Sequence, residues 1–118
     1  MNDSPAFNFA LMLKNWEVDH VPCFTDGKLV QRIFLLLAES LMKSKPLRLT
    51  EVYVSSTATE VGVRKRIRQL CDDGWIDIVT NEKDKRTKIV VPSKKFLLLI
   101  QEYQEKSAFF YKKSFKKV

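Results

Sequence analysis

The chain has 118 residues, of which 45% are hydrophobic, and it carries a formal net charge of +7 at pH 7. This length suits a single domain, and the apolar content is enough for one core, which excludes a chain that is disordered throughout. Residues 1–60 hold 6 basic and 7 acidic side chains, whereas residues 61–118 hold 15 and 7. The basic second half indicates a surface for a polyanion, although it would also suit a soluble basic domain without such a partner.

Cysteine usage, apolar runs and the lone histidine narrow the class of protein. Cys23 and Cys71 lie far apart without a CxxC pair, so we expect no metal, no cofactor and no disulfide framework, and a cytoplasmic location. The longest apolar runs, residues 33–38 and 96–100, are too short to cross a bilayer, and we expect no membrane partner. No nucleophile motif accompanies His20, and we therefore do not expect an enzyme.

The first half of the chain predicts two helices. Ser4 and Pro5 are typical of an N-cap followed by Pro at the first helical position, which predicts a helix over residues 5–18. Residues 19–27 contain Pro and Gly and break this helix. Residues 28–43 lack Gly, Pro and Asn and carry a broad apolar stripe of helical period, which predicts the central core helix.

The segment after Pro46 carries weaker signals. Residues 47–49 alternate apolar and basic side chains and predict a very short strand. Thr50 is expected to cap a short helix that ends at about Ser56, although the β-branched residues in this segment disfavour a helix.

Residues 59–73 have the pattern of a basic helix with one apolar side. Thr59 is the expected N-cap, and Gly74 fits a left-handed turn that ends the helix. Because successive residues are about 100° apart, one side collects the apolar residues Val63, Ile67, Leu70 and Cys71. The opposite side holds Val61, Lys65, Arg68 and Gln69, while Arg64 and Arg66 lie on the flanks. Asp72 and Asp73 oppose the helix dipole, so some fraying of the last turn is expected.

A charged hairpin follows this helix. Residues 75–79 and 88–91 have the composition of strands, and the polar stretch 81–87 between them predicts a hairpin loop. Pro92 is expected to end the second strand and Ser93 to cap a final helix. The order predicts a mainly α fold with a small antiparallel β wing, which is a winged helix-turn-helix. We expect one domain over residues 1–118, with an N-terminal helix and loop (1–27), a winged-helix core (28–92) and a C-terminal helix (93–118).

Four segments carry a pattern that goes beyond this order of elements. Residues 50–52 begin the first motif helix, and residues 59–70 place apolar residues at helical spacing. Gly74-Trp75-Ile76 leads into the hairpin, and Asp84-Lys85-Arg86 places an Asp-x-Arg motif at its tip. Together these segments resemble the MarR family of bacterial winged-helix transcription regulators over about residues 28–97, with looser similarity at both ends. Residues 91–96 depart from the family pattern, because they lack its usual Gly.

The resemblance implies roles for residues and partners. In the family the wing Arg contacts DNA and the Asp helps to hold it, and these roles are carried onto Arg86 and Asp84. The resemblance also implies a homodimer built from both terminal helices, and a small-molecule effector. Aromatic residues on those helices would form an intersubunit layer or complete the monomer core: Phe7, Trp16, Phe96, Tyr103 and Phe110. Some regulators of this kind use an N-terminal Cys as a redox sensor, but Cys23 has no evident cationic setting and is interpreted as a bystander.

The predicted partner is double-stranded DNA. Arg and Lys pair with guanine, Gln pairs with adenine, and an apolar side chain can touch the thymine methyl group. Binding of phosphates by Lys and Arg adds affinity that falls with salt. Gly62 is predicted to let the helix approach the DNA backbone closely. The full set of predicted DNA-binding residues is Thr59, Val61, Gly62, Arg64, Lys65, Arg68, Gln69, Lys83, Asp84, Lys85 and Arg86.

Three functions fit a winged helix with this surface. The first is a DNA-binding transcription regulator that reads duplex DNA with the recognition helix (about 59–73) and the basic wing (about 81–88). The second is a winged-helix protein–protein interaction module, which would tend to expose apolar or acidic residues where this chain exposes basic ones. The third is a phage or plasmid replication or partition factor, which would also bind DNA and which the sequence does not separate from the first.

Overall fold

A computed structural model of the chain describes residues 4–21, 27–56 and 58–115. The elements in these ranges are α1 (Pro5–His20), α3 (Lys28–Lys43), β1 (Leu47–Arg48), α4 (Leu49–Ser55), α5 (Glu60–Asp72), β2 (Ile76–Thr80), β3 (Lys88–Pro92) and α6 (Lys94–Phe115). The three strands form one antiparallel sheet in the order β1-β3-β2. The predicted fold class, mainly α with a small β wing, is therefore confirmed.

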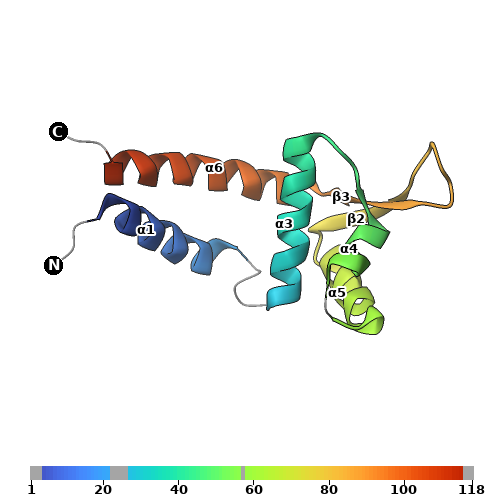
Figure 1. Cartoon of the computed structure of the whole chain (residues 1–118). Coiled ribbons are helices and arrows are strands. Elements are labelled where there is room, and N and C mark those ends of the chain that lie inside the picture. The colour runs from blue at the N-terminus through green and yellow to red at the C-terminus, as the bar shows by residue number, and fades with distance from the viewer. Residues whose placement is uncertain (1–3, 22–26, 57, 116–118) are drawn as a thin grey trace.

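The molecule is elongated, with principal extents of 56 × 27 × 22 Å. Figure 1 shows α1 and α6 side by side as an arm on one side of α3, while α4, α5 and the wing lie on the other side. We call α1 together with α6 the arm. The loop between β2 and β3 extends furthest from the arm. This arrangement separates the basic helix and the wing from both ends of the chain.

Helix α3 stands at the centre of the core. Its apolar stripe buries Ile33, Phe34 and Leu37, as the helical period predicted. Phe96, in the first turn of α6, is fully buried and its ring packs edge-on against Phe34 at 5.1 Å between centroids. Phe96 therefore belongs to the monomer core, and α6 is anchored there before it leaves as part of the arm.

The start of α4 differs from the prediction. Thr50 is not the N-cap, because α4 begins at Leu49 and Arg48 takes the capping position. The Glu51 carboxylate accepts a hydrogen bond from the Arg48 backbone N–H at 2.9 Å. That hydrogen bond is the largest of the effects that lower the pKa of Glu51. A glutamate that reaches back from the third helical position thus replaces the expected threonine cap.

The short strand predicted over residues 47–49 is present as β1, and it joins the two wing strands in one sheet. Leu47 in β1 pairs with Val90 in β3, and Ile78 in β2 pairs with the same residue from the other side. The second wing strand was predicted over residues 88–91, with Pro92 ending it. Pro92 is itself the last residue of β3 and is paired with Ile76. Proline is tolerated at this strand end because few ladder hydrogen bonds remain to be made there.

Polar and aromatic contacts hold the arm together. Tyr103 of α6 donates its hydroxyl hydrogen bond to the Glu17 carboxylate of α1, and its ring packs edge-on against Trp16 at 5.6 Å between centroids. Trp16 and Glu17 are both buried, with 8% of each residue exposed. Trp16 and Tyr103 therefore pack within one chain, whereas Phe7 is exposed on the outside of α1.

Candidate nucleic-acid interface

Helix α5 is capped at both ends by its own sequence. Thr59 Oγ1 accepts a hydrogen bond from the Gly62 backbone N–H at 3.1 Å, which confirms the predicted N-cap. At the other end, the Trp75 N–H donates to the Leu70 carbonyl at 2.9 Å, as in a Schellman motif. Gly74 has φ +80°, a backbone conformation in which L side chains are strained, so a glycine suits this turn.

The two sides of α5 separate as the helical period predicted. Val63, Ile67 and Leu70 are buried, and Cys71 is half-buried against the core. The exposed residues include the whole predicted base-reading group: Val61, Lys65, Arg68 and Gln69. Val61 stands out because 75% of this apolar residue is exposed in the first turn of the helix. An exposed valine between basic residues is able to touch a thymine methyl group in a major groove.

Two of the cations on the flanks of α5 have partners on the helix itself. Arg64 forms an ion pair with Glu60 at 3.0 Å. The pKa of its guanidinium is raised, chiefly by a hydrogen bond with Tyr53 and next by the charge of Glu60. Arg66 donates a hydrogen bond to the Gln69 Oε1 at 2.9 Å. Because adenine recognition by glutamine uses this oxygen as well as the amide group, Gln69 would have to release Arg66 in order to read a base.

Gly62 has a structural explanation that the sequence did not suggest. A Cβ atom at this position would lie 3.2 Å from Thr59 Oγ1, which is a tight contact for two side-chain atoms. Glycine therefore leaves room for the hydroxyl that caps α5. Its predicted role in a close approach to DNA stays a prediction.

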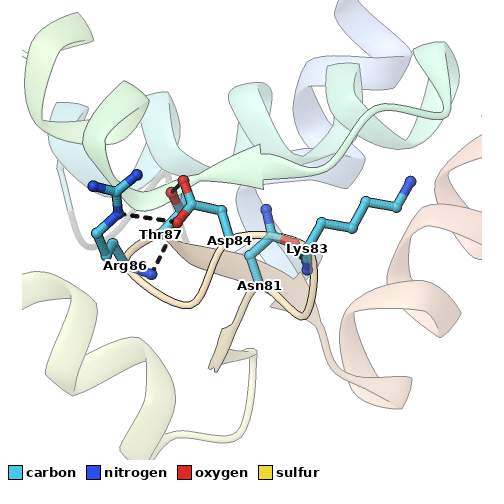
Figure 2. A network of polar contacts seen from close by, with 5 residues as sticks. All are labelled: Asn81, Lys83, Asp84, Arg86 and Thr87. Atoms are coloured by element: carbon cyan, nitrogen blue, oxygen red, sulfur yellow. Dashed lines mark hydrogen bonds and ion pairs between the residues drawn. The ribbon is translucent and has the colours of Figure 1, made fainter.

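The wing tip is ordered around Asp84, as Figure 2 shows. Its Oδ1 accepts hydrogen bonds from the Arg86 backbone N–H at 3.1 Å and from Arg86 Nε at 3.4 Å, and its Oδ2 accepts one from the Thr87 hydroxyl at 3.1 Å. These bonds, with the Arg86 backbone N–H first, lower the pKa of the Asp84 carboxyl. The Arg86 side chain is 93% exposed, so it is held at its base and free to contact a ligand at its tip.

The remaining wing residues complete a cationic tip. Lys83 and Lys85 are exposed, and the Lys83 backbone N–H donates to the Asn81 side chain at 3.0 Å. Figure 2 shows the Lys83 and Arg86 side chains pointing away from each other on the two sides of the loop. The wing therefore offers separated positive charges at the end of the molecule that also carries α5.

One basic surface beside the wing was missed by the sequence. An open hollow of about 390 Å³ lies between β1 and the start of the wing loop. It is lined by Lys45, Pro46, Arg48, Glu51 and Asn81. No local motif marks these residues, because only the pairing of β1 with β3 brings them to the wing. Arg48 also contacts Glu51 at 3.3 Å, which leaves Lys45 as the less constrained cation of the hollow.

The other candidate residues show no second site. His20 lies at the end of α1, not in a loop, where its ring stacks on Trp16 at 4.6 Å and its Nδ1 contacts the Trp16 carbonyl at 2.8 Å. Burial raises the pKa of the Cys71 thiol, whereas Cys23 lies outside the described residues. Within the described ranges, no cluster of His, Cys, Asp and Glu could hold a metal ion, and none of the helices is long and apolar enough to span a membrane.

Comparison with known proteins supports the fold. No protein-family model matches the sequence, and no curated protein sequence matches it at a significant level. Among solved structures, a transcriptional regulator from Thermotoga maritima matches with a TM-score of 0.64 and 19% identity, covering 88% of this chain and 70% of that one. AbsC, a MarR family transcriptional regulator from Streptomyces coelicolor, matches with a TM-score of 0.58 and 13% identity, covering 93% and 73%.

A third structure adds a regulated DNA-binding protein. BpsR from Bordetella bronchiseptica, whose DNA binding is regulated by 6-hydroxynicotinic acid, matches with a TM-score of 0.50 and 14% identity, covering 97% of this chain and 76% of that one. These similarities extend over the arm as well as the winged core, since they cover most of the chain. The chain therefore has the winged-helix fold of the MarR-type transcriptional regulators.

Proposed function

We propose that the protein is a transcription regulator that binds duplex DNA through α5 and the wing. The observation that carries this proposal is the exposed basic side of α5, at the same end of the molecule as a wing tip with Arg86 held by Asp84. An interaction module would tend to expose apolar or acidic residues here, whereas this side of α5 is basic. The fold, shared with solved transcriptional regulators, supports the same conclusion.

The arrangement divides the work between base reading and phosphate binding. In the proposal, α5 enters the major groove, where Lys65 and Arg68 donate to guanine and Val61 contacts a thymine methyl group. Arg86 and the wing lysines bind the backbone or the minor groove beside it. Arg64 starts in an ion pair with Glu60 and exchanges that carboxylate for a phosphate, because both are oxyanions within reach of one guanidinium.

A gel-shift assay with random-sequence duplex DNA tests this surface. Lys65→Ala and Arg86→Ala are each expected to weaken binding. The double variant should lower the steepness of log affinity against log salt by about 1 if Arg86 contacts a phosphate, because Lys65 is assigned to a base. The control is Lys106→Ala combined with Lys112→Ala, which removes the same charge from exposed positions of the arm. Equal DNA affinity of the two double variants would contradict the proposal that α5 and the wing bind DNA.

We further propose that the protein is a homodimer joined through the arm. Phe7, Leu11 and Val18 are 59%, 47% and 54% exposed, and their spacing places them on one side of α1, where the exposed Lys14 lies among them. Large apolar side chains exposed together on one side of a helix are typical of an interaction surface. A second copy fits it because a two-fold dimer pairs a patch with itself and would place two reading helices on a symmetric site.

Sedimentation analysis tests the dimer. Leu11→Glu is expected to shift the protein to a monomer at micromolar concentration and to weaken binding to a symmetric DNA site. Val54→Glu is the matched control, because it places the same charge on an exposed valine of α4, outside the arm. A wild-type protein that sediments as a monomer under these conditions would contradict the dimer without touching the DNA-binding surface.

The proposal includes a small-molecule effector, supported by the regulation of DNA binding in the Bordetella protein. The expected effect is a change in DNA affinity on addition of an aromatic carboxylic acid. Titration of 6-hydroxynicotinic acid and related acids into the protein–DNA complex measures it, and unchanged affinity across that set would remove this part of the proposal.

A further inference from the structure

The residues at the C-terminal end of α5 carry charges that are unfavourable for the helix dipole. A helix end carries partial negative charge and favours cations nearby. The last turn of α5 contains no basic residue, and the helix ends on Asp72 followed by Asp73. Arg68 and Gln69 are the residues of the predicted base-reading group that lie closest to this end. A mobile end would therefore reach the proposed reading surface directly.

A cation from another element compensates for this. Lys95, in the first turn of α6, donates a hydrogen bond from its Nζ to the Asp73 backbone carbonyl at 2.9 Å. The same Nζ lies over the Trp75 ring, 4.1 Å from the centroid. Trp75 in turn packs edge-on against Phe34 of α3 at 5.6 Å between centroids. One ammonium group thus joins the end of α5, the entry to the wing and the start of α6.

Hydrogen bonds hold the backbone at the start of α6, on either side of Lys95. The Ser93 backbone N–H donates to the Trp75 carbonyl at 3.0 Å, and the Ser93 hydroxyl accepts from the Phe96 N–H at 3.1 Å to cap α6. A lysine in the first turn of α6 is unfavourable for the dipole of α6 itself. Its position is better explained by the end of α5, where its charge is favourable. Lys94, the adjacent lysine, makes no comparable contact among the described residues.

We propose that Lys95 is a positioning residue that holds the C-terminal end of α5, and with it Arg68 and Gln69, in place for binding. Its effect on DNA rests on the proposed function, whereas its effect on the helix end does not. The tether would transmit to α5 any displacement of α6 relative to the winged core. Through this contact the arm and the reading surface are joined directly and not only through α3.

Amide hydrogen exchange on the DNA-free protein tests the tether. Lys95→Met keeps most of the apolar stem, and exchange of the Gly74 and Trp75 amides is expected to become about 5-fold faster, since a cation at a helix end and a cation–π contact each contribute modestly. Lys94→Met removes the same charge from the same helix turn and should leave these amides unchanged. Lys95→Arg retains a cation and a donor and should restore slow exchange.

DNA affinity provides the second measurement. With a pool of random-sequence duplex DNA at fixed ionic strength, Lys95→Met is expected to bind about 3-fold more weakly than Lys94→Met, because the C-terminal part of α5, with Arg68 and Gln69, is held less firmly. Equal exchange in the two variants, or faster exchange in Lys95→Met with equal affinity, would overturn the positioning role. If the wild-type protein binds no DNA, the proposed function fails, while the exchange data still decide whether Lys95 holds the helix end.

Discussion

The hydrogen bond between Tyr103 and Glu17 makes a prediction about the stability of the arm. Tyr103→Phe removes one hydroxyl from a carboxylate that is only 8% exposed. The other carboxylate oxygen, Oε1, is buried and has no hydrogen-bond partner among the described residues. Removing the hydroxyl therefore leaves the buried Glu17 carboxylate without the hydrogen bond from Tyr103, which Oε2 accepts, while Oε1 accepts none from the described residues. We expect a loss of about 2 kcal/mol in the free energy of unfolding, within the range for hydrogen bonds to charged groups.

A double-mutant cycle separates this bond from packing. Glu17→Leu removes the buried carboxylate, after which the half-buried Tyr103 hydroxyl can turn toward water, so this single change is expected to cost little. Once the carboxylate is gone, adding Tyr103→Phe should also cost little, which gives a coupling energy of about 1–2 kcal/mol. Replacing both polar partners with apolar groups is often nearly neutral.

Urea unfolding followed by far-UV circular dichroism and tryptophan fluorescence measures the cycle. Trp16 packs against Tyr103 and reports on the arm, while Trp75 packs against Phe34 and reports on the winged core. Circular dichroism reports on all helices. Every variant should be compared at one protein concentration, because dimer formation would add to the apparent stability. A Tyr103→Phe variant within about 0.5 kcal/mol of the wild type, or a cycle with purely additive changes, would refute the argument.

Three further predictions concern α5 and the wing. Gly62→Ala should gain less than the roughly 1 kcal/mol that helix propensity gives, because its Cβ would meet Thr59 Oγ1 at 3.2 Å; urea unfolding should show the full gain only in a Thr59→Ala background. The pKa of Asp84 is lowered in the folded protein. Its hydrogen bonds are therefore fully present at a pH above the ordinary pKa of 3.8, and they are lost as the pH falls through the lower pKa of the folded state. An NMR titration of the Arg86 amide should therefore have a midpoint below 3.8, and Asp84→Asn should abolish it. The raised pKa of Cys71 keeps its thiol protonated at neutral pH, so alkylation by iodoacetamide should be slower in the folded protein than in urea, and equal rates would contradict this.

The sequence predicted those elements whose signals are local. Thr59 and Gly74 mark the ends of α5 because a cap and a left-handed turn each depend on a few neighbouring residues. The apolar spacing of Val63, Ile67 and Leu70 was sufficient to orient the helix, and all three are buried. The Asp84–Arg86 contact was also accessible, since the two residues are only two positions apart.

Contacts between distant segments could not be predicted in this way. The bond from Lys95 to Asp73 spans 22 positions and that from Tyr103 to Glu17 spans 86, so neither leaves a pattern in a short window of sequence. Thr50 is a plausible cap by residue type, because threonine is a common cap. In the structure α4 begins one residue earlier, and the Glu51 carboxylate accepts the hydrogen bond of the Arg48 backbone N–H at the helix start. The base-reading roles of the α5 residues stay predictions, because exposure alone does not show which atoms meet DNA.

Helix α6 runs without interruption over 22 residues from the wing side of the core to the outer end of the arm. At 1.5 Å per residue it is a rod of about 33 Å, so a tilt of about 5° at its base moves its far end by about 3 Å. The converse also holds: a displacement of that size at the outer end of the arm corresponds to a rotation of a few degrees at the start of α6. The end of α5, which Lys95 joins to this part of α6, would turn with it.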